Sequence, residues 1–342
     1  MSENATREAP KVDRQPMDKC PNCNLLLLEP VTACPGCGAD FKIKPSVPGY
    51  RIEAEIGQDR WGGVYQAFRK SDGFEFELHM IDAARIGGEG ALDPLIDKIR
   101  ELTSLTDMHL VLLKGAGRTD TAAYFLTEKP RGEALSRLLE KTPVLSEIMC
   151  VKIVLDLARA FDELERQGVR HGRITARDIV LGVDGSAQLK HAAVTDLFAK
   201  TAPHLFENVE DIAHAAPEEF TFGARGFLSD QYSLGAVIYR AVSGATPFQG
   251  KEPEEVKTKV LMTRPAAPKL ASPGMRTLLA QMLAKDPASR FESPTTLYKA
   301  AGKLGAAILA KRMTGTQIPI PPPDEAPPDA QRAGPGGLPS DE

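Results

Sequence analysis

The hydrophobic pattern changes its period once along the central part of the chain, and this change limits the possible folds more than any other feature. Early in that part, apolar and polar side chains alternate, most clearly over Phe74–Ile81, as in a half-buried β-strand. Later, apolar side chains recur every three to four residues, for example between Ser146 and Gly168, which are suited to begin and end a helix. This order predicts an α+β fold, with a strand-rich lobe over about residues 50–128 and a larger helical lobe over about residues 133–312.

Composition divides the rest of the chain into segments that flank this 50–312 unit. Residues 1–16 are polar and without periodicity, which predicts a disordered leader, and a Pro-Ser-Val-Pro-Gly linker occupies residues 45–49. A compact cysteine-containing segment lies between them, at residues 17–44. Residues 313–342 contain eight prolines, so a disordered tail is predicted. A solvated tail is the simplest interpretation, and a polyproline II ligand for a proline-reading partner is the alternative.

Length and charge exclude several classes of protein. The chain has 342 residues, more than one hydrophobic core usually supports. Its 42 Lys and Arg against 46 Asp and Glu give a formal net charge of −4, which argues against a dedicated nucleic-acid binder. No apolar run approaches the roughly 18 residues that span a bilayer, and the polar N-terminus lacks the apolar segment of a signal peptide. We therefore expect a cytoplasmic protein with no membrane and no nucleic-acid partner.

Four of the five cysteines form two closely spaced pairs, Cys20-Pro-Asn-Cys23 and Cys34-Pro-Gly-Cys37. Two intervening residues let both sulfurs of a pair reach one ion, and Pro and Gly favour tight turns. Four thiolates satisfy tetrahedral Zn²⁺ and leave no open position, so a structural zinc site is predicted, with redox dithiols or an iron centre as alternatives. The segment resembles the small zinc ribbons of many bacterial proteins, which implies an interaction module. Cys150 lies apart and is predicted to be a buried small hydrophobe.

Six short motifs follow one another through the 50–312 unit. They are Ile56–Ala67, Glu128–Gly132, Gly168–His171, Ala216-Pro217-Glu218, Ser229–Gly235 and Asp286–Phe291. In this order they resemble the glycine-rich loop, the hinge, the approach to the catalytic loop, the Ala-Pro-Glu motif, the long buried helix and the late arginine motif of the eukaryotic-type Ser/Thr protein kinases. The resemblance covers the whole unit and implies the bilobal protein-kinase-like fold, preceded here by the predicted zinc ribbon.

The resemblance assigns structural roles to three residues. It implies that Glu218 pairs with Arg290, a buried bond between the activation segment and the helical lobe. It also implies that Asp230 accepts backbone N–H groups of the catalytic loop. Because a buried ion pair is costly to break, keeping both partners predicts that the helical lobe folds in the family manner. The resemblance further implies nucleotide contacts in and after the glycine-rich loop, at Gly57, Gly62, Val64 and Ala67.

The positions that carry chemistry in the family hold other residue types in this chain. Phosphoryl transfer uses a lysine on the third strand, a glutamate on the first helix and a substrate-facing aspartate, with an asparagine and a second aspartate for Mg²⁺. The helix position can also be counted to Glu101, and Thr175 replaces a phosphate-contacting lysine, while Asp59 replaces the second glycine of the loop. In chain order the five catalytic positions read His79, Lys98, Arg173, Asp178 and His191.

Replacement of several catalytic groups at once predicts a pseudokinase with no catalytic residues. Loss of one positioned group typically costs ~10²–10⁴ in rate. Mg²⁺ prefers carboxylate oxygens, and Asp178 alone is a poor site, which argues against ATP with Mg²⁺ as a cofactor. The predicted function is that of a scaffold or signalling regulator that acts through protein–protein binding, with active kinases among the partners to consider.

The sequence leaves three alternatives open. The first is a divergent but active ATP-dependent Ser/Thr protein kinase. The second is a nucleotide-sensing module that works without Mg²⁺, in a cleft where Lys98 and Arg173 favour phosphate. The third is a transition-metal site, because the imidazoles of His79 and His191 with the carboxylate of Asp178 are suitable ligands. A simpler interpretation of His79, His191 and Asp178 is that they are polar residues in a cleft that no longer has its former task.

Overall fold

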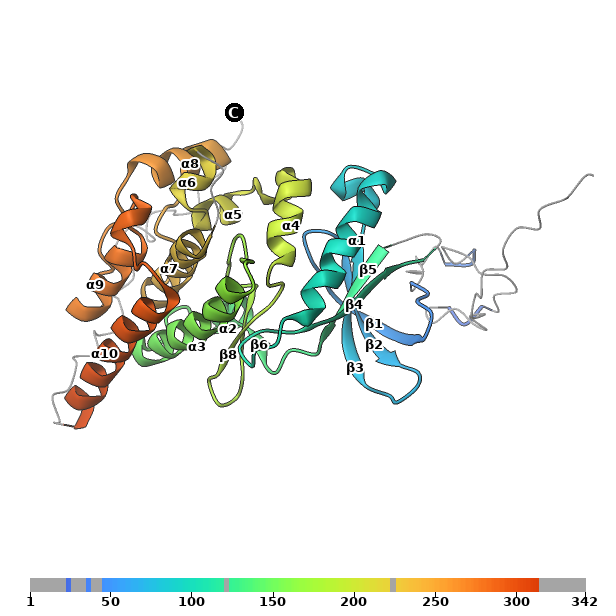
Figure 1. Cartoon of the computed structure of the whole chain (residues 1–342), viewed down its shortest axis with the longest axis horizontal. Coiled ribbons are helices and arrows are strands. Elements are labelled where there is room, and N and C mark those ends of the chain that lie inside the picture. Colours follow the sequence, from blue (N-terminus) through green and yellow to red (C-terminus); the bar gives the residue numbers. More distant parts are fainter. Residues whose placement is uncertain (1–22, 26–34, 38–44, 120–122, 222–225, 314–342) are drawn as a thin grey trace, which may run out of the picture.

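The computed structural model describes residues 23–25, 35–37, 45–119, 123–221 and 226–313, and its two lobes lie side by side along the long axis (Figure 1). The N-lobe is an antiparallel five-stranded sheet in the order β1-β2-β3-β5-β4, with helix α1 packed against β4 and β5. Its elements are β1 (Tyr50–Gln58), β2 (Gly63–Arg69), β3 (Glu75–Ile81), α1 (Leu92–Glu101), β4 (Leu113–Arg118) and β5 (Ala123–Glu128).

Strand β3 confirms the alternating pattern and orients one residue of special interest. Phe76 and Leu78 pack with Ala67 of β2 in a small apolar cluster on one face of the sheet. The next side chain, that of His79, is also completely buried. Since successive side chains of a strand point to opposite faces, His79 faces the other side, toward the C-lobe.

The C-lobe is helical, with one small antiparallel sheet in the order β6-β7-β8 at its boundary with the N-lobe. Helix α4 lies between the other C-lobe helices and α1 (Figure 1). The elements are β6 (Glu133–Ala134), α2 (Leu135–Lys141), α3 (Glu147–Arg166), β7 (Ile179–Leu181), β8 (Ala187–Leu189), α4 (Val194–Thr201), α5 (Val209–His214), α6 (Pro217–Thr221), α7 (Phe227–Ser243), α8 (Pro253–Met262), α9 (Pro273–Met282) and α10 (Pro294–Met313).

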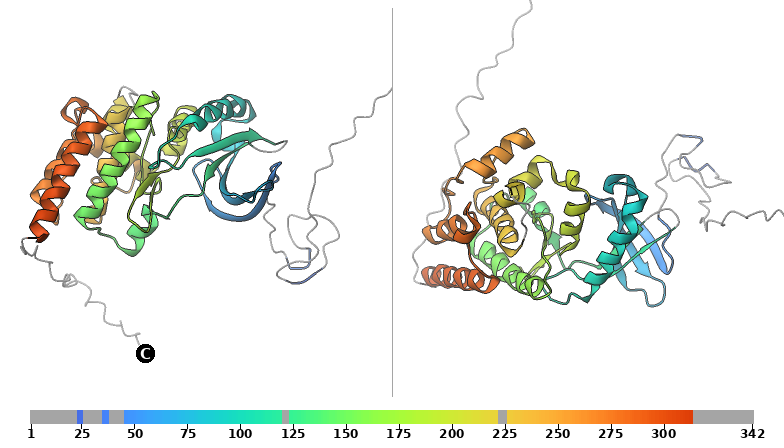
Figure 2. Two further views of the ribbon diagram at one scale, coloured as in Figure 1. Left: turned by 60° about the horizontal axis from the view of Figure 1, so that its bottom comes forward. Right: turned by 45° about the horizontal axis from the view of Figure 1, so that its top comes forward.

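Helices α3 and α7 form the centre of the C-lobe. Helix α3 begins directly after Ser146, and Gly168 beyond its end adopts a left-handed φ of 67°, so the predicted helix is confirmed. Most residues of α7 are buried, as expected for the family's long buried helix. One hydrophobic cluster runs from α1 through α3 and α7 to α10 and joins the lobes. Both views in Figure 2 keep the N-lobe sheet at one end and α10 at the other.

The predictions for the flanking segments mostly fall outside the described residues. Cys20 and Cys34 lie outside them, and so do the leader and nearly all of the tail. Cys23 and Cys37 are described and exposed. Because the other two cysteines are not described, the zinc ribbon stays a prediction. Cys150 is buried in α3 as predicted, and burial raises the pKa of its thiol to about 12. No helix in the described part of the chain is long and apolar enough to cross a membrane.

Candidate functional site

The loop between β1 and β2 bends into the space between the lobes. The N–H of Asp59 donates to the carbonyl of Gly62 (2.8 Å), and the N–H of Asp82 donates to the carbonyl of Trp61 (2.9 Å). Gly62 lies so close to the sheet that a Cβ atom there would be 2.3 Å from the carbonyl oxygen of Met80. The tip of the predicted glycine-rich loop is therefore pressed against the sheet, and only glycine permits this approach.

The side chain of Trp61 fills the space between the lobes and is 0% exposed. Its ring stacks on Phe198 of α4, with 4.4 Å between centroids and 14° between planes. It also contacts Phe125 of β5 at 5.8 Å and lies edge-on to His191 at 5.0 Å. A single aromatic side chain of the loop thus joins the N-lobe sheet to the C-lobe, in the region that the resemblance assigns to the nucleotide.

The neighbouring Arg60 fastens the loop to the C-lobe. Its guanidinium Nη2 donates to Asp211 of α5 at 2.5 Å, and its Nη1 lies 3.7 Å from Asp178. The guanidinium also lies over the ring of Phe206, 5.1 Å from its centroid. Burial opposes the charge, but the carboxylates of Asp178 and Asp211 together raise the pKa of Arg60 above its usual value. The loop is therefore held closed by a buried charge network between the lobes.

His79 occupies the position of the catalytic lysine and has no free face. Its ring stacks on Phe125, with 4.5 Å between centroids and 3° between planes. Its Nδ1 lies 2.5 Å from Asp59 Oδ2, and its Nε2 lies 3.2 Å from the hydroxyl of Thr127. Burial lowers the pKa of His79 below its usual value, although the Asp59 carboxylate opposes this shift. Burial alone would raise the pKa of Asp59, but nearby His191 and His79 lower it below its usual range.

Asp178 and His191 occupy the two positions that hold Mg²⁺ in the family. The N–H and hydroxyl of Thr175 donate to Asp178 Oδ2 at 2.9 and 2.8 Å, and His191 Nδ1 lies 3.4 Å from Asp178 Oδ1. Burial opposes ionisation of Asp178, but Arg60 and the hydrogen bond from His191 lower its pKa well below the usual range. His191 adopts a left-handed φ of 54°, a conformation that non-glycine residues take up rarely.

These residues do not fit ATP with Mg²⁺. The carboxylate of Asp178 is already used by Thr175 and His191, and Trp61 takes up the space beneath the loop. No lysine stands at His79, so no phosphoryl-transfer step follows from this arrangement. Of the four predicted nucleotide contacts, Gly57 is exposed on β1, and the other three are buried in the N-lobe: Gly62, Val64 and Ala67.

The structure corrects the placement of Lys98, which was expected in the cleft. Its side chain is 61% exposed on the outer face of α1, and its ammonium group lies 3.2 Å from the carboxylate of Glu101. The buried face of the helix carries Leu95 and Ile99 instead. An amphipathic helix turns its apolar side chains to the sheet, so both Lys98 and Glu101 face solvent.

Arg173, in the position of the substrate-facing aspartate, also points away from the cleft. Its Nη1 donates to the carbonyl of Phe206 and its Nη2 to the carboxylate of Glu219, both at 2.8 Å. The side chains of Arg173 and Glu219 are 5% and 0% exposed. Glu219 also accepts the N–H of Ala216. The expectation that Arg173 faces a phosphate is therefore wrong, since its charge is neutralised by a buried carboxylate within the C-lobe.

The three retained structural residues make the contacts that the resemblance implies. The N–H groups of His171 and Gly172 donate to Asp230, each at 2.8 Å. Burial raises the pKa of Asp230 to about 7, although these two donors oppose the shift. Arg290 donates from Nη1 and Nη2 to the two oxygens of Glu218 at 2.7 and 2.9 Å. The catalytic-loop region and the activation segment are thus anchored as the sequence predicts.

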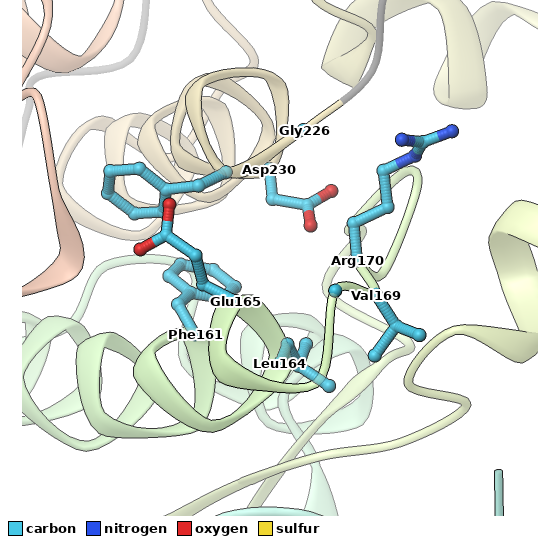
Figure 3. Close-up of a pocket in the computed structure, with 9 residues that line it drawn as sticks. Phe161, Leu164, Glu165, Val169, Arg170, Gly226 and Asp230 are labelled. Carbon is cyan, nitrogen blue, oxygen red and sulfur yellow. The ribbon is translucent and has the colours of Figure 1, made fainter.

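A cavity of about 190 Å³ lies behind the catalytic-loop region (Figure 3). Phe161 and Leu164 of α3 line it together with Phe227 and Asp230 of α7. Figure 3 shows the Asp230 carboxylate directed toward the segment that carries Arg170. Because that carboxylate already accepts two backbone N–H groups, we assign no reaction to this cavity.

Two parts of the closed cleft have no local signal in the sequence. Arg60 and Asp211 are 151 positions apart, and Phe198 lies in a helix that none of the six motifs includes. Trp61, the single tryptophan of the chain, lies between these two parts, but its residue type does not by itself show whether the ring turns into the cleft.

Acid should weaken the fold through His171, whose Nε2 lies 2.9 Å from the carbonyl of Lys190. Burial lowers its pKa from 6.5 to about 4. Between these values only the unfolded chain binds the extra proton, so stability rises with pH through this window and is lost as pH falls. His171→Gln removes that contribution. Its stability–pH slope should therefore be lower than wild type by about 1.4 kcal/mol per pH unit.

Urea unfolding at several pH values between about 4 and 6.5 measures these slopes. The matched control is His204→Gln, which replaces an exposed imidazole and should keep the wild-type slope. Equal slopes for wild type and His171→Gln would contradict a buried, neutral His171.

Comparison with known proteins gives a consistent picture. A family model described as a protein kinase domain matches residues 50–300. A RAC family serine/threonine-protein kinase homolog of Dictyostelium discoideum is 22% identical over 75% of this chain and 58% of its own length. Serine/threonine-protein kinase ULK3 of Xenopus laevis is 25% identical, over 72% of this chain and 53% of its own. CBL-interacting serine/threonine-protein kinase 1 of Arabidopsis thaliana is 25% identical, over 70% and 55%. The chain thus spans a little over half the length of these relatives.

Proposed function

The chain belongs to the protein kinase family, and from that premise we propose that it is a pseudokinase, a scaffold or signalling regulator that acts by binding other proteins. Its partners would be signalling proteins, active kinases among them. In this proposal the kinase fold supplies surfaces and a fixed arrangement of two lobes, and no phosphoryl group is transferred.

The burial of Trp61 is the observation that carries the proposal. A nucleotide beneath the loop would have to displace a ring that stacks on Phe198 and contacts Phe125. It would also have to break the buried contact of Arg60 with Asp211. Burying a tryptophan contributes several kcal/mol, so nucleotide binding would have to offset a large cost before any net affinity appears.

The replaced catalytic positions support the same proposal independently. The lysine position holds His79, which contacts Asp59 and Thr127, and the base position holds Arg173, which contacts Glu219. Each lost catalytic group typically costs ~10²–10⁴ in rate, so the combined loss leaves little activity. The cysteine pairs would add a structural zinc site at Cys20, Cys23, Cys34 and Cys37, and with it a second surface for partner binding.

A nucleotide titration is expected to leave the thermal stability of the full chain unchanged. The measurement is the unfolding temperature with ATP or ADP, each with and without Mg²⁺. A ligand at 100 times its dissociation constant would add ~2.7 kcal/mol, which such a measurement detects. The physical reason for a null result is the filled cleft, in which Trp61 occupies the space beneath the loop.

The outcomes separate the alternatives. A shift that requires Mg²⁺ would contradict the proposal and favour an active, divergent Ser/Thr kinase. A shift that persists after chelation of Mg²⁺ would favour a nucleotide-sensing module. An active protein kinase, titrated in parallel, shows that the assay detects nucleotide binding under the same conditions.

A further inference from the structure

Three potential metal ligands from different parts of the chain converge inside the closed cleft. They are Asp59 of the β1–β2 loop, His79 of β3 and His191 of the segment between β8 and α4. One ligand atom from each lies within 4.8 Å of the other two. Asp59 Oδ2 is 2.5 Å from His79 Nδ1 and 3.6 Å from His191 Nε2.

The second nitrogen of each imidazole has its own partner on the far side. Nε2 of His79 lies 3.2 Å from Thr127 Oγ1, and Nδ1 of His191 lies 3.4 Å from Asp178 Oδ1. Metal-bound histidines characteristically donate their other ring N–H to an oxygen in this way, which fixes both the tautomer and the ring orientation. Each ring therefore presents its remaining nitrogen to the same small volume beside Asp59.

One of these nitrogens lacks a hydrogen-bond partner among the described residues, although it lies 3.6 Å from Asp59 Oδ2. Nε2 of His191 is buried and makes no hydrogen bond in the described part of the chain. A buried polar atom without a partner costs about 1–3 kcal/mol, so such an atom calls for an explanation. A bound cation beside the Asp59 carboxylate would satisfy it.

The charges around the cluster are unbalanced toward negative. Lys190 lies 3.2 Å from Glu77, next to His79, and Arg60 lies between Asp178 and Asp211. With Asp59 these groups make four carboxylates against two cations, while a histidine ligand to a metal is neutral. The excess of two negative charges matches the charge of one divalent ion.

We propose that Asp59, His79 and His191 bind a divalent transition-metal ion, of the class of Zn²⁺ or Co²⁺. Two imidazoles and one carboxylate suit such ions, whereas Mg²⁺ and Ca²⁺ prefer oxygen ligands throughout. Asp59 is thus the third ligand in place of Asp178, which the sequence pattern predicts for that role and which instead orients His191. The third donor is thus a residue that replaces a glycine of the loop.

Metal uptake requires a small rearrangement that the site can accommodate. Two ligands on one tetrahedral zinc ion are separated by about 3.3 Å, so the contact between Asp59 and His79 must lengthen while that to His191 nearly fits. Without the ion, the proton of His79 is on Nδ1, facing the Asp59 carboxylate. When Nδ1 binds the ion, the proton is on Nε2 instead, where the hydroxyl of Thr127 accepts it, because a hydroxyl serves either tautomer. The ion would join the loop and β3 of the N-lobe to the C-lobe.

Cobalt titration of the metal-free full chain tests the proposal. Cobalt held by cysteine thiolates absorbs intensely in the near ultraviolet, whereas a histidine–carboxylate site gives only visible bands. We expect the wild-type chain to bind one equivalent of Co²⁺ with the visible bands of a histidine–carboxylate site. Asp59→Asn and His191→Gln should each lose that equivalent alone. Asp72→Asn and His204→Gln, which change exposed side chains, are the matched controls and should keep it.

A second variant keeps the test decisive if a ligand variant fails to fold. Thr127→Val leaves all three ligands in place and should weaken Co²⁺ binding by about 10–100-fold. Near-ultraviolet circular dichroism of each metal-free variant checks the fold. The proposal would be overturned if wild type bound no Co²⁺ with the histidine–carboxylate spectrum, or if wild type and Asp59→Asn bound equal amounts of it. Neither result bears on the nucleotide titration, so the site and the pseudokinase proposal can fail separately.

Discussion

Replacing Arg290 with methionine is expected to lower the free energy of unfolding by about 3–5 kcal/mol. The side chain of Arg290 is fully buried and donates to both oxygens of Glu218. Removal of the guanidinium would leave the Glu218 carboxylate without its cation in a largely buried site, where Ser229 would be its remaining side-chain partner. The cost arises from this stranded charge more than from the lost attraction, and urea unfolding measures it.

An exposed ion pair provides the matched control. Lys98→Met removes a cation from a pair with Glu101 in which the two side chains are 61% and 67% exposed, and should cost less than about 0.5 kcal/mol. The two variants make the same kind of exchange in different surroundings. A loss near 0.5 kcal/mol for Arg290→Met as well would show that the Glu218 pair is not an anchor of the C-lobe.

Replacing Trp61 with alanine should have an effect of similar size, about 3–5 kcal/mol, for a different reason. The indole ring is completely buried between Phe125 and Phe198, so its removal leaves a cavity where the lobes meet. The neighbouring contact of Arg60 with Asp211 limits how far the loop can move to fill that cavity. Thermal and urea unfolding of the full chain measure the loss.

The control for this second prediction is an aromatic side chain on the surface. Phe74 is 65% exposed, and Phe74→Ala should change stability by less than about 0.5 kcal/mol. A Trp61→Ala variant that unfolds like wild type would mean that the ring does not fill the cleft. The main argument for the pseudokinase proposal would then be lost.

The sequence predicts the frame of the molecule because the relevant signals are local. Helical spacing between Ser146 and Gly168 defines α3, and the alternation over Phe74–Ile81 defines β3. The pairing of Glu218 with Arg290 follows from a family motif whose two parts both persist. The helix and the strand depend only on short stretches of the chain, and the ion pair depends on two motifs that are both present.

The directions of individual side chains were harder to predict. The family pattern predicts Lys98 in the cleft, although Leu95, Ile96 and Ile99 mark the apolar face of that helix and put Lys98 on the opposite face. For Arg173 no such signal exists, because its partner Glu219 lies 46 positions further along the chain. Long-range pairs of this kind appear only when the fold brings their elements together.

The inward pairing of Arg173 has a consequence for how the chain could change. An aspartate at this position would remove the cation that pairs with Glu219, whose side chain is 0% exposed, and would add a second carboxylate to the same buried region. Repulsion between the two would disfavour the native state, so the reversal would need a simultaneous change at position 219. If the pseudokinase proposal holds, an aspartate at position 173 would therefore have to be accompanied by a second substitution before the C-lobe could keep its stability.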